Sequence, residues 1–152
     1  MTSAPDLATA SLVDIASALR SGSQTAIGIA EWAIDNHDQR GEALHAYKTW
    51  MPDKVRGEAA AADATFAAGI DLGPLQGIPV SIKDLVGVAG YPIFAGCPRQ
   101  LPESWAVDGP IVGAIRQQLG VISGKTHTVQ FAFGGMGANR HWGPPRNPWD
   151  AN

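Results

Sequence analysis

The chain has 152 residues, of which 45% are hydrophobic and 16% are charged, and its formal net charge at pH 7 is −3. This composition predicts an ordered globular protein of one domain at most and excludes an intrinsically disordered chain. Because no basic cluster is present, we expect no direct binding to nucleic acid, and because no apolar run reaches the roughly 20 residues that span a bilayer, we expect no membrane association.

Residues 1–72 are predicted to be mainly helical, because they contain only 7 of the 29 glycine and proline residues of the chain. Both residue types interrupt helices. Ser11 and Asp14 have the spacing of a capping box at a helix N-terminus. Apolar residues at helical spacing follow, and Gly22 suits the C-terminal end of this first helix.

Two more helices and one strand are predicted in this region. The second helix is predicted to begin near Thr25, and residues 46–50 are predicted to form a short strand. The third helix is predicted over residues 53–68, because this segment follows Pro52, is rich in alanine and ends before Gly69.

Residues 73–152 contain the other 22 glycine and proline residues and are predicted to form an α/β region with many loops. A strand is predicted at residues 80–82, followed by an irregular segment at residues 87–105. Asp108 is predicted to cap a helix that continues to Gly120. We expect functional residues in this region, because loops held by rigid elements often carry function.

Residues 121–123 are predicted as a strand and residues 126–133 as a helix. The Gly-Lys-Thr sequence between them resembles the end of a phosphate-binding loop, but that motif requires four residues between its glycines, and only three separate Gly120 from Gly124. We therefore exclude nucleotide binding at this position. Lys125 is predicted to be structural and hydrogen-bonded to nearby carbonyl groups.

Residues 73–84 have the sequence GPLQGIPVSIKD and place Lys83 at the end of a predicted buried strand. The pattern leaves two interpretations of this lysine open. In the first, its side chain reaches solvent and pairs with Asp84, because lysine is rarely fully buried. In the second, burial lowers the pKa of Lys83, so that its amine acts as a base at neutral pH.

A second set of motifs follows at residues 124–126 (GKT), 131–137 (FAFGGMG) and 143–150 (GPPRNPWD). Together with residues 73–84, and in this order and spacing, they resemble the amidase signature family, whose serine hydrolases use a Ser-cisSer-Lys triad. The resemblance covers most of the chain and is specific in its second half.

The resemblance implies an α/β fold in which helices cover a mixed β-sheet. It implies that residues 1–152 are a single partial amidase domain, with a helical N-terminal region (1–72) and an α/β region (73–152). Lys83 is then the catalytic general base, and no metal or organic cofactor takes part.

In the family, both serines of the triad follow the Asn-Pro-Trp-Asp element and so lie beyond Asn152. We therefore expect the 152 residues to be the N-terminal part of an amidase, with an incomplete fold and no activity alone. In such a part, the strands at residues 80–82 and 121–123 are expected to lack neighbours.

Gly134, Gly135, Met136 and Gly137 form a glycine-rich loop. Its pattern fits both a tight connection with positive φ angles and a loop whose backbone amides meet an anion or a developing oxyanion. By resemblance, this loop borders the substrate pocket, so that its four residues are the predicted substrate-binding residues. Family members often carry serines here, and their replacement by glycine and methionine leaves the polar contribution to the backbone.

The chain has four histidines, at positions 37, 45, 127 and 141. They lack the spacing of metal ligands, so no metal site is predicted. His127 is expected on the helix that follows Gly-Lys-Thr. Cys97 is either a nucleophile or a small buried side chain. Arg140 and Arg146 either bind a substrate carboxylate or pair with acidic residues of the protein surface.

Three functions remain open. The leading one is an amidase that cleaves the carboxylic amide C–N bond of a small molecule. The second is glutamine hydrolysis by the A subunit of the glutamyl-tRNA(Gln) amidotransferase. This subunit passes the released ammonia to a partner subunit. The third is a non-catalytic truncated fragment. A homodimer and an amidotransferase partner subunit are the two forms of assembly considered. The single cysteine and the lack of a secretory signal favour the cytoplasm.

Overall fold

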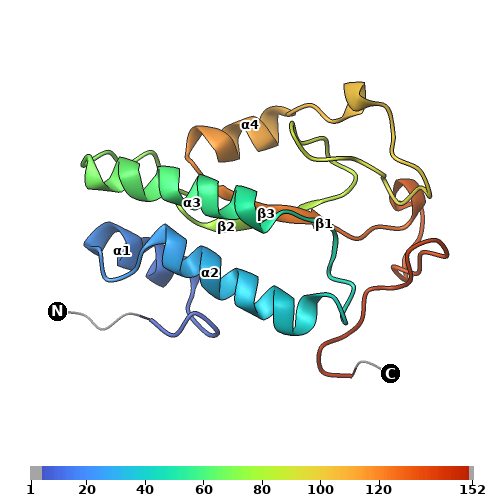
Figure 1. Ribbon diagram of the computed structural model, residues 1–152, viewed down its shortest axis with the longest axis horizontal. Coiled ribbons are helices and arrows are strands. Elements are labelled where there is room, and N and C mark those ends of the chain that lie inside the picture. Colours follow the sequence, from blue (N-terminus) through green and yellow to red (C-terminus); the bar gives the residue numbers. More distant parts are fainter. Residues whose placement is uncertain (1–4, 151–152) are drawn as a thin grey trace. The chain divides into compact units, whose positions relative to one another are not determined.

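A computed structural model describes residues 5–150 (Figure 1). The chain forms two compact units, each built from several segments. The first unit consists of the described residues up to Asp35 together with Met51–Val80 and Ala114–Ser123. The second consists of Asn36–Trp50, Ser81–Gly113 and the described residues from Gly124 onward. The chain therefore passes from one unit to the other several times, and the candidate residues after Val80 lie in the second unit.

Helix α1 (Leu12–Ser21) of the first unit begins and ends as its sequence predicts. The hydroxyl of Ser11 accepts a hydrogen bond from the backbone N of Asp14 at 3.2 Å, and the backbone N of Ser11 donates to the Asp14 carboxylate at 3.3 Å. Gly22 ends the helix with a φ of 71°. The capping box and the glycine stop are thus both confirmed.

Helices α2 (Ala26–Asn36) and α3 (Pro52–Ala67) lie side by side in the first unit (Figure 1). The carboxylate of Asp63 on α3 accepts hydrogen bonds from the backbone N of Ala26 at 2.7 Å and of Ile27 at 3.0 Å. An acidic side chain at a helix N-terminus satisfies amides that have no partner within the helix. Arg56 on α3 also pairs with Glu31 on α2 at 2.7 Å.

The core of the first unit is formed by aliphatic residues of the helices and of the adjoining strands. Its buried hydrophobic residues include Leu19, Ala26, Ile29, Ala30, Ile34, Val55, Ala59, Ala62, Ile78, Val121 and Ile122. Gly77, with a φ of 72°, passes so close to α2 that a Cβ would stand 2.9 Å from the Cβ of Ala26. Only glycine fits this approach and this backbone conformation.

The sheet has three strands, β1 (Tyr47–Trp50), β2 (Pro79–Lys83) and β3 (Val121–Thr126), in the order β1-β3-β2. Strands β1 and β3 are antiparallel, with Tyr47 opposite Thr126 and Trp50 opposite Gly124. Strand β3 includes the Gly-Lys-Thr sequence, which therefore forms no phosphate-binding loop. The expectation that strand 121–123 lacks neighbours is wrong, because β3 lies between the other two strands; β2 is an edge of this sheet.

Helix α4 (Pro110–Gln117) is shorter than predicted. It ends before Leu119, which has a φ of 52° that an α-helix does not allow. The carboxylate of Asp108, two residues before the helix, accepts a hydrogen bond from the backbone N of Ala89 at 2.7 Å. Three short helical turns complete the fold: a π-helix at His37–Gly41 and 3₁₀ turns at Glu103–Trp105 and Gln130–Ala132.

The helix predicted at residues 126–133 is wrong. Thr126 ends β3, and the turn Gln130–Ala132 contains Phe131 with a φ of 49°. The backbone N of Phe131 donates to the carbonyl of Ala95, and the carbonyl of Thr128 accepts from the side chain of Asn139. Because backbone groups of this segment bond to other segments, they are not used in a helix.

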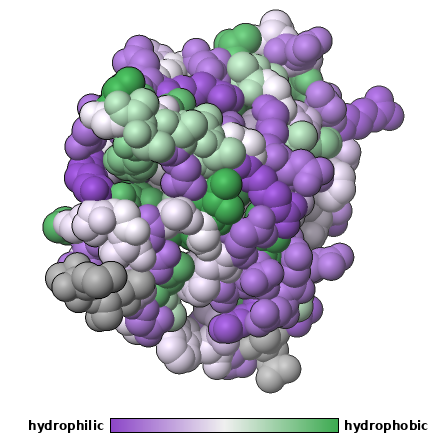
Figure 2. Space-filling model, turned by 60° about the vertical axis from the view of Figure 1, so that its left-hand side comes forward, coloured by the Kyte–Doolittle hydropathy of each residue, from purple (hydrophilic) through white to green (hydrophobic). Residues whose placement is uncertain are grey.

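Large hydrophobic side chains are also exposed at several places, among them Leu12, Val13, Trp105, Ile111, Phe133, Met136 and Trp149. On the face shown in Figure 2, hydrophobic areas lie among hydrophilic residues and form no single continuous surface. No helix within residues 5–150 has the length and apolar character needed to cross a membrane.

Candidate active site

Lys83 lies at the end of β2 with its side chain exposed. Ser81 is also exposed, whereas Ile82 between them is buried. Because successive side chains of a strand point to opposite faces, Ser81 and Lys83 share one face of β2. The first interpretation of Lys83 is thus correct in part. Its side chain reaches solvent, as that interpretation states, but it does not pair with Asp84.

Asp84 pairs instead with Lys125 on β3, with 3.1 Å between Oδ1 and Nζ. The two side chains are 1% and 0% exposed. The Asp84 carboxylate also accepts from the backbone N of Phe94 at 3.1 Å, and the backbone N of Asp84 donates to the carbonyl of Thr126 at 3.0 Å. Lys125 is thus structural, as predicted, but its partner is a carboxylate where carbonyl groups were expected.

These contacts hold the residue that directly follows Lys83. A buried charge pair is stable only when both partners keep their hydrogen bonds, so Asp84 has little freedom to move. The backbone at the end of β2 is fixed accordingly, and the side chain of Lys83 extends from this rigid segment of backbone. The sequence contained one signal for this pair, since both residues are charged and adjoin predicted strands.

Lys48 on β1 lies between two aromatic rings of the second unit. Its Nζ is 4.0 Å from the ring centre of Phe94 and 3.7 Å from that of Trp142. Burial lowers the pKa of Lys48, and the nearby carboxylate of Asp84 opposes this shift. Trp142 is itself held by a hydrogen bond from its Nε1 to the carbonyl of Cys97 at 3.0 Å.

His127 directly follows β3 and lies on no helix, in contrast to the prediction. Burial lowers the pKa of His127, the charges of His45 and Lys48 lower it further, and Asp84 raises it. The two imidazole rings of His45 and His127 have centres 6.3 Å apart. Within residues 5–150, no group of three or more histidine, cysteine, aspartate or glutamate side chains is arranged to hold a metal ion.

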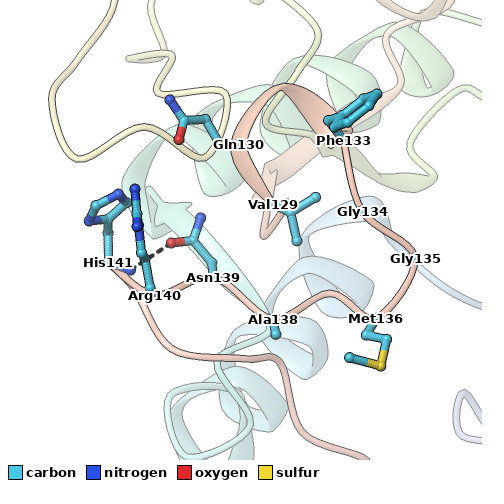
Figure 3. A pocket seen from close by; sticks show the side chains of 10 residues that line it. All are labelled: Val129, Gln130, Phe133, Gly134, Gly135, Met136, Ala138, Asn139, Arg140 and His141. Atoms are coloured by element: carbon cyan, nitrogen blue, oxygen red, sulfur yellow. Dashed lines mark hydrogen bonds between the residues drawn. The ribbon is translucent and has the colours of Figure 1, made fainter.

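A pocket of about 360 Å³ lies along the glycine-rich loop (Figure 3). Gly134, Gly135 and Met136 line it, whereas Gly137 is not among the lining residues. Gly137 has a φ of 69° and so serves as a turn residue. The full lining consists of Val129, Gln130, Phe133, Gly134, Gly135, Met136, Ala138, Asn139, Arg140 and His141.

Asn139 holds the loop that carries the pocket. Its Nδ2 donates to the carbonyls of Gly96 at 2.8 Å and Thr128 at 3.0 Å. Its Oδ1 accepts from the backbone N of His141 at 2.8 Å (Figure 3) and from the backbone N of Trp142 at 3.2 Å. A buried amide with all these partners fixes three segments together. This role of Asn139 was not predicted from the sequence, because its partners are either distant along the chain or belong to no regular element.

The two arginines differ in position. Arg140 is exposed and lines the pocket next to Asn139 and His141 (Figure 3). No ion pair between described residues involves Arg140. Arg146 is exposed outside the pocket lining, and its backbone N donates to the carbonyl of Leu44. Cys97 is buried, which agrees with the structural interpretation of that residue.

The chain is similar to amidases over most of its length. The family model Amidase matches residues 29–152. The chain is 50% identical over 139 residues to the 2-amino-5-chloromuconic acid deaminase of Comamonas testosteroni, a match that covers 91% of this chain and 30% of that protein. It is 33% identical over 144 residues to the A subunit of the glutamyl-tRNA(Gln) amidotransferase of Thermobifida fusca, covering 93% of this chain and 28% of that protein.

Among solved structures, a crystal structure of an amidase superposes with a TM-score of 0.83 at 28% identity, covering 93% of this chain and 32% of that chain. These matches confirm the family that the motifs indicated and the partial α/β fold that it implied. The chain spans about 30% of the length of the curated relatives that it matches.

Proposed function

Because the chain belongs to the amidase family, we propose that it supplies the general base of an amidase and that Lys83 is this base. The observation that supports the proposal is the position of Lys83. It ends β2 in the family's lysine-bearing motif, and the next residue is fixed by a buried ion pair. A base held in this way is positioned for proton transfer, as general-base catalysis requires.

The proposed reaction is the hydrolysis of a carboxylic amide C–N bond by a Ser-cisSer-Lys triad. Lys83 accepts the proton of the cis-serine, and the cis-serine accepts the proton of the nucleophilic serine. The oxygen of the nucleophilic serine attacks the carbonyl carbon of the amide at the same time. Return of the proton releases ammonia or an amine and leaves an acyl-enzyme, which water hydrolyses. The resemblance implies that both serines follow the Asn-Pro-Trp-Asp element and lie outside these 152 residues.

Lys83 must be neutral to accept a proton. Its side chain is exposed in the structure of residues 5–150, so the burial that would favour the neutral amine has to come from the remainder of an active site. We therefore propose that the complete protein, and not the 152-residue chain alone, is the active species. No metal or organic cofactor has a part in the proposed mechanism, and a cytoplasmic enzyme is the setting we favour.

The pocket along the glycine-rich loop is the proposed substrate site. Gly134, Gly135 and Met136, which line the pocket, would border the substrate with their backbone amides as its polar contacts, and Gly137 would hold the turn of the loop. Arg140 lines the same pocket and is exposed. Its planar guanidinium suits a substrate carboxylate, and one relative is named for its action on an amino-muconic acid, which carries carboxylates.

The test uses the complete protein that carries these residues. Release of ammonia or amine is measured with aliphatic amides, aryl amides, glutamine and a 2-aminomuconic acid. We expect Lys83→Ala to lower kcat by at least about 10²-fold, the low end of what a positioned base supplies. Lys54→Ala on α3 is the matched control and should retain activity. Full activity of Lys83→Ala would reject Lys83 as the base.

The 152-residue chain is assayed in parallel against the same substrates. We expect no turnover above that of its Lys83→Ala variant, since a base without the triad serines cannot form an acyl-enzyme. Turnover above this control would direct attention to another nucleophile, of which Cys97 is the first to examine.

The glutaminase component of a tRNA-dependent amidotransferase is the second candidate function. The relative from Thermobifida fusca, which matches over 93% of this chain, supports it. Preferential hydrolysis of glutamine, together with co-purification of a partner subunit, would favour this function over that of a free-standing amidase. A folded protein that is inactive on every one of these substrates would favour the third function, that of a non-catalytic fragment.

A further inference from the structure

Tyr47 reaches across the central strand of the sheet. Its hydroxyl oxygen lies 2.6 Å from Oγ of Ser81, although β1 and β2 are separated by β3 in the strand order. The two residues thus connect both edges of the sheet within the second unit. A side-chain hydrogen bond of this span requires that nothing stands above β3 between them.

Gly124 on β3 provides this space. A Cβ at position 124 would stand 2.9 Å from Cδ1 of Tyr47 and 2.5 Å from the carbonyl oxygen of Thr49. Real Cβ atoms do not approach other atoms so closely, so any other residue would displace the Tyr47 ring or the backbone of β1. The glycine of the Gly-Lys-Thr sequence therefore allows the Tyr47 ring to lie over β3.

The Tyr47–Ser81 bond lies on the face of β2 that carries Lys83. Ser81 and Lys83 are both exposed, and the buried Ile82 separates them. Side chains two residues apart on a strand originate about 6.6 Å from each other on the same face. The four-carbon chain of lysine is long enough to bring its amine to a hydroxyl at that distance.

We propose that Tyr47 is a positioning residue for Lys83 and acts through the hydroxyl of Ser81. A phenol, with a pKa of about 10, is a stronger hydrogen-bond donor than an aliphatic alcohol. Tyr47 therefore donates to Ser81, which leaves the Ser81 O–H free to donate to the neutral amine of Lys83. A donor to the neutral amine stabilises the form that accepts a proton. The inference rests on the proposed function of Lys83 as a base.

The test is a double-mutant cycle in the complete protein, with kcat/KM for an amide substrate measured against pH. Tyr47→Phe keeps the ring over Gly124 and removes only the hydroxyl. We expect it to move the acidic limb of the profile upward by about half to one pH unit, the shift that loss of one neutral hydrogen bond produces. Ser81→Ala should move the limb in the same direction.

The cycle separates this role from a structural one. If Tyr47 acts through Ser81, then Tyr47→Phe has no further effect on the limb in the Ser81→Ala background. The chain contains one other tyrosine, and Tyr91→Phe is therefore the matched control, with the limb unchanged. A lower melting temperature of Tyr47→Phe with an unmoved limb, or equal shifts in both backgrounds, would overturn the inference.

Two further measurements distinguish failure of this inference from failure of the proposed function of Lys83. Lys83→Ala with full activity rejects Lys83 as the base, whatever Tyr47 does. The pH dependence of reductive methylation at Lys83, followed by peptide mass spectrometry, reports its apparent pKa without requiring activity. A methylation profile unchanged by Tyr47→Phe would overturn the inference even if Lys83→Ala is inactive.

Discussion

The ammonium of Lys125 and the carboxylate of Asp84 form an ion pair with 3.1 Å between Nζ and Oδ1, and neither side chain is more than 1% exposed. The pair joins the central strand β3 to the residue after Lys83. Removal of one partner leaves an uncompensated buried charge, which costs more than loss of an exposed ion pair. The end of β2 therefore depends on Lys125 for its conformation.

The first prediction concerns the stability contributed by this pair. We expect Lys125→Met to lower the free energy of unfolding by about 3–5 kcal/mol, because Asp84 stays buried without its counter-charge. Lys83→Met, which replaces an exposed lysine on the neighbouring strand, should change it by no more than about 0.5 kcal/mol. Urea unfolding of the 152-residue chain measures both variants. Similar losses for the two would contradict the assignment of Lys125 as the structural lysine.

The second prediction concerns Arg140 as a carboxylate-binding residue. In the complete protein, Arg140→Gln should raise KM by roughly 10-fold or more for substrates that carry a carboxylate, since a hydrogen bond to a charged group is lost. KM for neutral amides should change little. Arg146→Gln, outside the pocket lining, is the control. Equal changes in KM for both substrate classes would show that Arg140 does not recognise the carboxylate.

The third prediction is a pH dependence that arises from His127. Its pKa lies below the ordinary value of 6.5, chiefly because the ring is buried. In the pH range between the lowered pKa and 6.5, the unfolded chain binds the proton more readily than the folded chain. The free energy of unfolding therefore falls as the pH decreases through this range and is fully retained above it.

His127→Gln should remove this part of the pH dependence, because glutamine does not titrate. Urea unfolding at pH 7.5 and at pH values below 6.5 would measure the difference between the variant and the parent. His45, Lys48 and Asp84 act on the same imidazole, so His45→Gln is a useful comparison. A parent and a His127→Gln variant with parallel pH curves would exclude His127 as the source.

The fourth prediction concerns the 152-residue chain in isolation. Strand β2 is an edge of the sheet, and three apolar side chains of the second unit, Phe133, Met136 and Trp149, are 96%, 90% and 94% exposed. Unpaired edges and exposed apolar groups promote association. We expect size exclusion with light scattering to show oligomers, and Phe133→Ser with Met136→Ser to reduce them. A sharp monomer of the parent would contradict this expectation.

Hydrogen exchange should distinguish the strands of the sheet. We expect strong protection of backbone amides in β3, which has a neighbour on each side, and weaker protection in β2. The sequence-based expectation that both strands lack neighbours predicts weak protection in both. Comparison of the amides of residues 124–126, the part of β3 that pairs with β1, with those of β2 would decide between the two expectations.

Prediction from sequence succeeded where local interactions determine the structure. The ends of α1 follow from the Ser11–Asp14 capping box and from Gly22, all close together in sequence. Prediction failed at residues 126–133, where a helix was expected and residues 130–132 make only a short turn. There, bonds to Ala95 and Asn139 replace those of a helix, and such distant partners leave no periodic pattern in the sequence.

By itself, the sequence determined the family, the helices of the first region and the position of Lys83 at a strand end, because motif spacing, caps and apolar periodicity are local properties. Only the tertiary structure decided that Asp84 pairs with Lys125, 41 positions away, and that Tyr47 bonds to Ser81 across Gly124. The physical reason is that a buried charge or hydroxyl takes its partner from the residues that the folded chain brings within hydrogen-bond distance, and not from its neighbours in sequence.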